Sequence, residues 1–142
     1  MIQHILDRKG SEVFTIHPTA TFAIATVRMR ERNVAALVAQ NGDTTVGIVS
    51  ERDCVTAVAR TGELAYSMTV SDIMTRKIVT IVPTDSIAKA MGLMTRYRVR
   101  HLPVIEDGKL AGIVSIGDLV KQRLEDLETE SNVLRDLYVA SH

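Results

Sequence analysis

The sequence contains a single cysteine, three prolines and no tryptophan, and it carries no net charge at neutral pH. One cysteine cannot form an internal disulfide, which agrees with a reducing compartment. Seventeen acidic and seventeen basic residues cancel, so no overall positive field indicates nucleic-acid binding. No apolar run is long enough to span a bilayer, and the first residues lack the apolar core of a signal peptide. We therefore expect a cytoplasmic protein that binds neither membrane nor nucleic acid.

Apolar residues make up 46% of the 142 residues, which is enough for the core of one compact domain. The sequence shows no cluster of metal-binding residues, no pairing of a nucleophile with a base and no complete glycine-rich phosphate loop. We therefore expect a protein that is not an enzyme and that needs no metal.

A short motif occurs twice and organises the chain. It spans residues 112–120 and, 65 positions earlier, residues 47–55, and both copies read glycine, two apolar residues, serine, any two residues and aspartate. A short apolar run after a glycine predicts the end of a buried strand. The serine is a typical helix cap, and an aspartate in the first turn is favoured by the helix dipole. Each copy therefore predicts a strand-to-helix corner with a serine and an aspartate on the same side.

The repeat extends well beyond this motif. Aligning residues 13–55 with residues 78–120 without a gap gives 15 identities in 43 positions. The identical pairs outside the motif include Thr15/Thr80, Ile16/Ile81, Pro18/Pro83, Met29/Met94, Val34/Val99 and Leu37/Leu102. A match at one fixed displacement is typical of a duplicated supersecondary unit.

Each unit is predicted to fold in the order β-α-β-β-α. The first unit is expected to have strands at 13–16, 35–39 and 45–49, with helices after Thr19 or Thr21 and after Ser50. The second unit is expected to have strands at 78–81, 101–105 and 110–114, with helices after Asp85 or Ser86 and from Ser115. Asn-Gly and Asp-Gly pairs predict the hairpin turns. Strands that alternate with helices and show little polar alternation predict an α/β fold with helices covering the sheets.

The predicted segments are a helix over 1–12, a first repeat over 13–66, a connector over 67–77, a second repeat over 78–121 and a helical extension over 122–142. Within the connector, Ser71-Asp72 is expected to cap one short helix. In the extension, apolar residues recur every seven positions at Val120, Leu127 and Leu134, with Leu124 and Tyr138 beside them. We interpret this stripe as a face that packs on its own module or on a dimer mate.

The order of elements, the two corners and the run Arg100-His101-Leu102-Pro103-Val104 resemble the cystathionine-β-synthase (CBS) domain pair, also called the Bateman module. The resemblance covers about Val13 to Lys121 and is strongest to small stand-alone CBS pairs, whose corners read S-E-R-D and S-I-G-D as here. It implies two repeats packed through their sheets about a pseudo-two-fold axis, and a homodimer. It also implies a non-enzymatic sensor that binds an adenine nucleotide between the repeats, with AMP expected first and ATP, ADP or NAD as alternatives. Such a sensor passes its occupancy to an effector protein, whose identity is unknown.

The same resemblance assigns the ribose hydroxyls to Asp53 and Asp118, with Ser50 and Ser115 beside them. A carboxylate can accept both hydroxyls through charge-assisted hydrogen bonds, which supports this assignment. Two proline-interrupted segments resemble those that line the adenine pocket in the family, and they contribute Thr15, Ile16, His17, Thr80 and Val82. Phosphates require cations, and the candidates are Arg52, Arg98, Arg100 and His101.

These assignments have plainer explanations. A serine and an aspartate three residues apart at a helix start are more often a cap than a ligand site. Alternating arginines are typical of a solvated face, and Cys54, which aligns with Leu119, is expected to be a buried apolar position. The alternative function is a structural dimerisation or adaptor module whose nucleotide clefts are vestigial.

The two clefts are not expected to be equal, because the ribose groups are duplicated and the cations are not. At the positions of the cations the two repeats pair as Arg98/Asn33, Arg100/Ala35 and His101/Ala36. The charge of the phosphate contributes most of the binding free energy that a nucleotide gains over adenosine. The cations should therefore decide which cleft binds the nucleotide. We expect one dominant nucleotide per chain, with its ribose on Asp118 and its phosphates at Arg100 and His101. The cleft at Asp53 is expected to be weak or empty.

Overall fold

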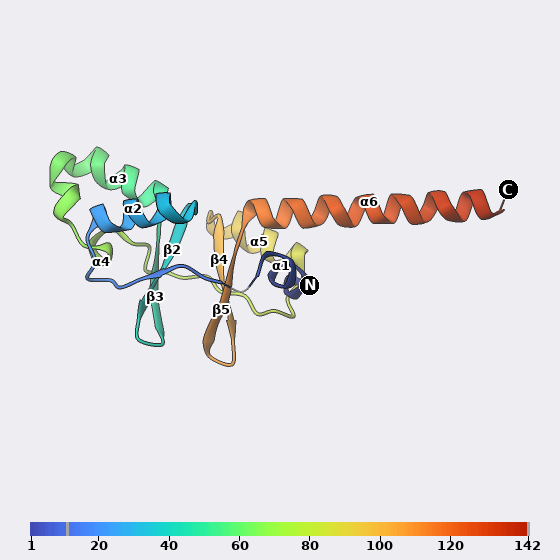
Figure 1. Cartoon of the computed structure of the whole chain (residues 1–142), viewed down its shortest axis with the longest axis horizontal. Helices are drawn as coiled ribbons and strands as arrows, with labels where there is room; N and C mark the ends of the chain where they lie inside the picture. The colour runs from blue at the N-terminus through green and yellow to red at the C-terminus, as the bar shows by residue number, and fades with distance from the viewer. Residues whose placement is uncertain (11, 142) are drawn as a thin grey trace.

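The computed structural model describes residues 1–10 and 12–141, and it contains two β-hairpins side by side, each with helices packed around it (Figure 1). The elements in chain order are α1 (Ile2–Lys9), β1 (Thr15–Ile16), α2 (Phe22–Arg32), β2 (Ala36–Asn41), β3 (Thr44–Ser50), α3 (Glu51–Thr61), the 3-10 helix η1 (Gly62–Ser67), α4 (Val70–Ile73), α5 (Ile87–Tyr97), β4 (His101–Glu106), β5 (Lys109–Ser115) and α6 (Ile116–Ser141). The chain therefore has the predicted α/β fold, and the order of helices and strands occurs twice.

The two sheets differ by one strand. In the first repeat β1 pairs in parallel with β2, which pairs in antiparallel with β3. The second repeat has β4 and β5, and the strand expected at 78–81 is reduced to one bridge between Ile81 and Val104. That prediction was wrong because the chain turns at once: the backbone N–H of Val82 donates to Asp85 Oδ2 at 2.9 Å, just ahead of Pro83. The bridge still keeps the 65-residue register, since it matches the pair Ile16 and Ala39.

Helix caps settle the open alternatives. Thr21 caps α2 by accepting from the N–H of Ile24, and Ser86 caps α5 by accepting from the N–H of Lys89. The expected cap at Ser71-Asp72 was wrong by two residues. Thr69 caps α4, and its backbone N–H donates to Asp72 Oδ2 at 2.9 Å, so Asp72 is the third helical residue and completes a capping box. The 3-10 helix η1 was not predicted from the sequence.

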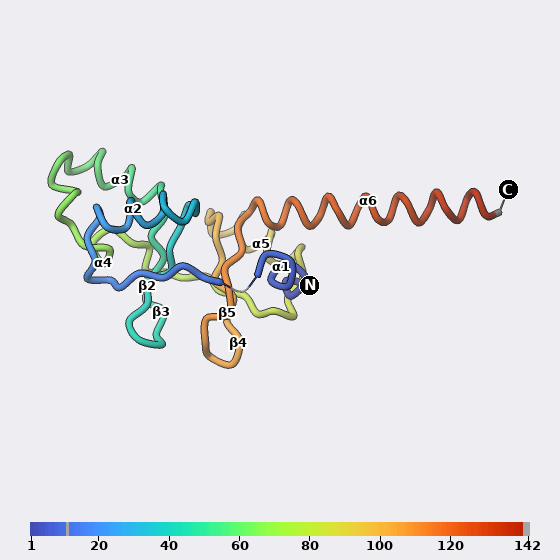
Figure 2. Tube along the Cα trace, viewed as in Figure 1, coloured from blue at the N-terminus to red at the C-terminus, as the bar shows by residue number. Residues whose placement is uncertain are grey.

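The hydrophobic cores show that the repeats exchange segments. Ile2, Ile5 and Leu6 of α1 are buried in the core of the second repeat, while Val70 and Met74 of the connector are buried in the core of the first. The trace in Figure 2 shows the same exchange, with α1 beside the β4–β5 hairpin and the following chain crossing to the other repeat. Each repeat is therefore completed by the segment that precedes the other repeat.

This exchange explains the glycine that opens both motifs. A Cβ on Gly47 would lie 2.5 Å from Met74 Sδ and 2.9 Å from the carbonyl oxygen of Thr75. A Cβ on Gly112 would lie 2.5 Å from Cδ2 of Leu6. Glycine at these two positions lets the exchanged segments approach the strands closely.

Candidate functional site

A cavity of about 470 Å³ opens where the first corner faces the second repeat. Three segments line it: the start of α3 with Ser50 and Asp53, the connector wall (Thr75, Lys77, Ile78 and Val79, where the connector runs into the second repeat), and the turn between α5 and β4. Its volume lies within the range of small-molecule sites in proteins. Residues from both repeats therefore meet in one ligand-sized space.

Asp53 lies half-buried in this cavity and caps α3. Its Oδ2 accepts from the backbone N–H of Ser50 at 2.9 Å and from Ser50 Oγ at 3.0 Å, and its own N–H donates to Ser50 Oγ at 3.3 Å. Oδ1 accepts a longer bond from Thr75 Oγ1 at 3.3 Å. A carboxylate offers about four acceptor positions, so Oδ1 keeps capacity for a further donor. Asp53 therefore both caps α3 and lines the cavity.

The connector forms the second wall. The backbone of Thr75 exchanges two hydrogen bonds with Ile48, from Ile48 N–H at 3.0 Å and to its carbonyl oxygen at 2.8 Å. This pairing fixes the next residues against the corner, so Ile78 and Val79 contribute apolar surface beside Asp53. This wall therefore presents the apolar side chains of Ile78 and Val79 in the same cavity as the acceptor carboxylate of Asp53.

Cations gather on the third side. Arg98, in the left-handed conformation with φ 55°, ends α5, and Arg100 and His101 follow it into β4. Arg52 from the start of α3 and Lys77 from the second wall add two more cations, and Lys77 Nζ lies 5.9 Å from the centre of the Tyr97 ring. Within residues 1–10 and 12–141, no carboxylate forms an ion pair with any of the three arginines. The cavity thus holds four cationic side chains, those of Arg52, Lys77, Arg98 and Arg100, beside the two carboxylates of Asp53 and Glu51, and among the described residues no ion pair joins them.

His101 lies between the two corners. Burial lowers the pKa of its imidazole below the ordinary value, and the positive charge of Lys9 lowers it further. Asp118 and Glu51 act in the opposite direction without reversing the shift. The imidazole is therefore neutral at pH 7 and is available to gain a proton beside a new negative charge.

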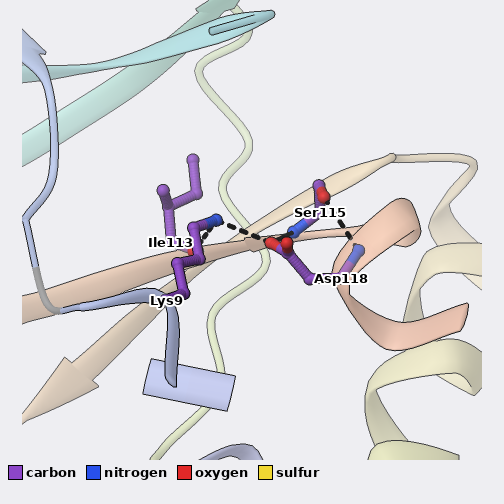
Figure 3. A network of polar contacts seen from close by, with 4 residues as sticks. All are labelled: Lys9, Ile113, Ser115 and Asp118. Atoms are coloured by element: carbon purple, nitrogen blue, oxygen red, sulfur yellow. Dashed lines mark hydrogen bonds and ion pairs between the residues drawn. The ribbon is translucent and has the colours of Figure 1, made fainter. Parts of the chain in front are cut away.

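The second corner has the same cap and a different neighbour (Figure 3). Asp118 Oδ2 accepts from the backbone N–H of Ser115 at 2.8 Å, and Ser115 Oγ accepts from the N–H of Asp118 at 3.1 Å. Lys9 Nζ, at the end of α1, lies 2.6 Å from the same Oδ2 and also donates to the carbonyl oxygen of Ile113 at 2.9 Å. Burial raises the pKa of Asp118, but the hydrogen bonds from Lys9 and Ser115 outweigh it and the net pKa is lowered.

The structure therefore differs from the expected pairing of carboxylate and cations. Arg98, Arg100 and His101 line the cavity of Asp53, whereas Asp118 is paired with Lys9. The sequence had suggested Asp118 because the register places these cations in the second repeat only, and His101 does pair with Ser115 across the hairpin. The turn at Arg98 nevertheless carries the arginine side chains to the other corner.

Of the thirteen predicted site residues, six line this cavity: Ser50, Arg52, Asp53, Arg98, Arg100 and His101. The two expected adenine segments do not. Ile16 is buried in the first core, His17 Nδ1 is hydrogen-bonded to Thr19 Oγ1, and the carbonyl oxygen of Thr15 accepts from Arg28. Val82 is bonded to Asp85, as described above, and Thr80 is exposed outside the cavity lining. We expected the proline to leave backbone groups of these segments free for a ligand. In the structure the carbonyl of Thr15 and the N–H of Val82 are hydrogen-bonded to nearby side chains.

Sequence reasoning missed the connector wall of Thr75, Lys77, Ile78 and Val79. A signal existed: shifted back by 65 positions, these residues fall on positions 10, 12, 13 and 14, so they follow α4 as those positions follow α1. Cys54 behaves as expected, because it is buried beside the corner. Burial raises its pKa to about 11, and Asp53 and Glu51 add to the shift, so the thiol is protonated at neutral pH.

The part of the chain that the structure describes contains no group of three or more His, Cys, Asp or Glu side chains placed to hold a metal ion. Among the same residues, no helix combines the length and apolar character needed to cross a membrane.

Two hairpin repeats at a fixed displacement, exchanging segments around a shared cavity, define a tandem-repeat module. The CBS domain family model matches this chain twice, over residues 5–60 and 70–125. The chain therefore belongs to the CBS domain family, as the resemblance of its corners had implied, and it is a CBS-pair module of the regulatory class.

Known relatives agree with this assignment. The structure of the CBS-domain containing protein ATU1752 from Agrobacterium tumefaciens is similar at 38% identity and TM-score 0.84, covering 86% of this chain and 98% of that one. The CBS domain-containing protein YhcV of Bacillus subtilis is 29% identical over 125 residues, which is 86% of either chain. The mitochondrial CBS domain-containing protein CBSX3 of Arabidopsis thaliana is 42% identical over 98 residues, 66% of this chain. This chain spans only 48% of that relative's length, and 57% of an uncharacterised Methanopyrus kandleri relative.

Proposed function

We propose that this protein is a non-enzymatic sensor that binds one adenosine-containing nucleotide in the cavity of Asp53. The observation that carries this proposal is the joint presence, in one cavity, of a carboxylate with acceptor capacity and several arginines without ion pairs. In the proposed complex Asp53 accepts the ribose hydroxyls, the apolar connector wall packs on adenine, and the arginines hold the phosphates.

The chemistry of the ligand follows from the three walls. Vicinal hydroxyls match a carboxylate whose Oδ1 is held only by the 3.3 Å bond from Thr75. Adenine is flat and apolar on its faces, which suits Ile78 and Val79. Arg98, Arg100 and Arg52 supply donors for phosphate in a fork geometry that lysine lacks. AMP is the first candidate because the cavity is small, and ATP, ADP or NAD are the alternatives.

A related fold lends support. The CBS domain pair of protein MJ0100 has the same fold at 22% identity, with TM-score 0.79, and is described in complex with 5′-methylthioadenosine and S-adenosyl-L-methionine. Both of those ligands contain adenosine. The fold is therefore compatible with such ligands, while the phosphate preference proposed for this chain rests on its own arginines.

Signalling follows from the position of the cavity. A nucleotide in it would contact α3 of the first repeat and the turn before β4 of the second, so it would favour the arrangement that holds both together. A ligand shifts such an equilibrium only by its difference in affinity for the two arrangements. The partner that reads this shift, the homodimer and the cytoplasmic location stay predictions, and the Arabidopsis relative is described as mitochondrial.

The test is calorimetric titration of AMP, ATP and NAD into the wild type, Asp53→Ala and Asp118→Ala. The two variants are matched, because each aspartate caps a helix through the same serine contacts. The loss of these cap contacts therefore appears in both variants. Because Asp118→Ala also breaks the pair with Lys9, the thermal unfolding of each unliganded variant is measured alongside the titrations. We expect Asp53→Ala to weaken AMP binding by about 10-fold to 150-fold, the range of a hydrogen bond to a charged group, and Asp118→Ala to change it little.

Three results would count against the proposal. Equal losses in both variants would show that the aspartates act only as caps. A selective loss in Asp118→Ala would return the site to the second corner. No heat with any of the three nucleotides would favour the alternative function, a structural dimerisation or adaptor module.

A further inference from the structure

The last helix extends far beyond the body of the molecule (Figure 1). Leu119 and Gln122 are buried against the body, and Arg8 of α1 forms an ion pair with Glu125. Every residue from 126 to 140 is exposed. An isolated helix of about 15 residues is only marginally stable in water, so this segment would gain stability by packing its apolar residues against another surface.

The exposed helix carries a narrow apolar seam with heptad spacing. The seam positions are Val120, Leu127 and Leu134 at d, and Leu124, Ser131 and Tyr138 at a. The five apolar members are between 42% and 64% exposed. Residues a and d alternate at three and four positions, so they form one continuous stripe along the helix. At its start the seam enters a groove lined by Ile116, Val120 and Leu124.

The residues that flank the seam carry charges of alternating sign. Arg123 and Glu130 occupy g positions, while Glu128 and Arg135 occupy e positions. In a parallel pair of helices each g residue faces the e residue five positions later on the other helix. The chain would therefore place Arg123 opposite Glu128 and Glu130 opposite Arg135, attractive in every case.

The opposite orientation gives the reverse result. When two copies run antiparallel with their seams in full overlap, g faces g and e faces e. Glu130 then faces Glu130, Glu128 faces Glu128, and Lys121 faces Arg135, and each of these is a like-charge contact. Like charges across an interface disfavour that arrangement. The charge pattern therefore selects both the partner and its direction.

We propose that α6 binds α6 of a second copy as a parallel, in-register two-stranded coiled coil from about Val120 to Tyr138. The segment is about 28 Å long at 1.5 Å per residue. Ser131 at the central a position interrupts the apolar seam with a small polar side chain, which lowers the stability of the pair. The proposal is independent of the nucleotide site, because it rests on residues beyond the cavity.

Cysteine cross-linking tests the geometry directly. In a parallel pair Ser131 lies next to Ser131 of the second copy, whereas Thr129 at position f points outward. Both residues are exposed and the native Cys54 is buried, so the two single substitutions are mild and comparable. Under mild oxidation we expect Ser131→Cys to form a disulfide-linked dimer about tenfold faster or more than Thr129→Cys. Equal rates in the two variants would overturn the proposal.

Sedimentation of variants tests the energetics with matched controls. Leu127→Glu/Leu134→Glu places charge in the seam, while Val133→Glu/Val139→Glu adds the same charge to exposed apolar residues outside it. We expect only the first pair to raise the dimer Kd, by about tenfold or more. Arg123→Glu should weaken the dimer, and Arg123→Glu/Glu128→Arg should restore it. A dimer weakened equally by seam and control variants, or a charge swap without rescue, would contradict a parallel coiled coil.

Discussion

Lys9 Nζ lies 2.6 Å from Oδ2 of Asp118, the second of the two repeated aspartates, and the two side chains come from opposite ends of the chain (Figure 3). The same ammonium donates to the carbonyl oxygen of Ile113. At the first corner the equivalent carbonyl, that of Ile48, accepts from the backbone of Thr75, whose hydroxyl also reaches Asp53. One repeat therefore completes its corner with a neutral hydroxyl, and the other completes it with a cation.

This difference has a consequence for pH. Hydrogen bonds from Lys9 and Ser115 lower the pKa of Asp118 in the folded protein below its ordinary value of 3.8. A carboxylate with a lowered folded pKa stabilises the fold at pH values above its unfolded pKa, and this contribution is lost as the pH falls through the folded pKa. The Lys9–Asp118 pair should therefore contribute at neutral pH and fade in acid below pH 3.8.

Lys9→Met removes the ammonium and keeps an apolar stem of similar length. Both partners of the pair are about a third exposed, so we expect a loss of about 0.5–1 kcal/mol in the free energy of unfolding at pH 7, the upper range for screened ion pairs. The difference from wild type should shrink below pH 3.8 to the part that comes from the bond between Lys9 and the carbonyl oxygen of Ile113. Urea denaturation at a series of pH values measures this. Lys89→Met, which breaks the pair of an exposed lysine with Asp85 four residues earlier, is the control, and an equal effect there would argue against a special role for Lys9.

The lowered pKa of His101 predicts a pH dependence of both stability and nucleotide binding. Burial lowers its folded pKa below 6.5, so the unfolded chain binds more protons between those two values, and stability should rise with pH across that window. A bound phosphate would raise the pKa of the imidazole again, so nucleotide binding should take up a proton near pH 6.5. Calorimetry in two buffers of different ionisation enthalpy counts that proton.

The comparison must be made against His101→Gln, because the phosphate of AMP itself titrates near pH 6 in every sample. We expect His101→Gln to lose the extra proton uptake. His17→Gln is the matched control, since His17 is exposed, bonded to Thr19 and outside the cavity. Identical proton uptake in wild type and His101→Gln would place the phosphate away from this imidazole.

The local parts of the site were predictable from the sequence. Ser50 and Asp53 form their corner through contacts three residues apart, and such caps follow from residue type and spacing alone. The partners of the corner were not predictable in this way. Thr75 reaches Asp53 from 22 residues further along the chain, and Lys9 reaches Asp118 from 109 residues earlier. Both contacts depend on the exchange of segments between repeats, which periodicity does not reveal.

The same exchange makes a prediction about the two motif glycines. A Cβ on Gly47 meets the carbonyl oxygen of Thr75 at 2.9 Å, and this backbone atom is fixed by its pairing with Ile48. A Cβ on Gly112 meets only the end of the Leu6 side chain, which can rotate. We expect Gly47→Ala to destabilise the fold by about 1–3 kcal/mol, and Gly112→Ala by less.

Gly92→Ala is the control for these alanines. Gly92 lies inside α5 with no atom within 4 Å of a built Cβ, so alanine should stabilise the helix by about 0.5–1 kcal/mol. Gly47→Ala should also weaken AMP binding, because it displaces Thr75 from the cavity wall, whereas Gly112→Ala should not. Thermal unfolding and titration of the three variants measure both effects. Equal destabilisation by Gly47→Ala and Gly112→Ala would contradict a close backbone approach at the first corner.

Arg100 supports the last prediction, which separates the phosphate from the rest of the ligand. It lines the cavity without an ion-pair partner among the described residues. Arg100 therefore does not have to break an ion pair with a carboxylate in order to bind a phosphate. We expect Arg100→Ala to weaken AMP binding by about 10-fold to 150-fold, the range for a hydrogen bond to a charged group. Adenosine has no phosphate, so its affinity should change by about twofold or less.

The control is Arg60→Ala, since Arg60 is exposed near the end of α3 and outside the cavity. It changes the net charge by the same amount, so any effect of overall charge on anion binding appears in both variants. Competition titrations at two salt concentrations distinguish the two contributions, because a long-range field is screened more strongly than a direct contact. A loss of AMP affinity that is equal in both variants would assign the arginine a field effect only. A loss that is equal for AMP and adenosine would assign Arg100 to the base or the ribose.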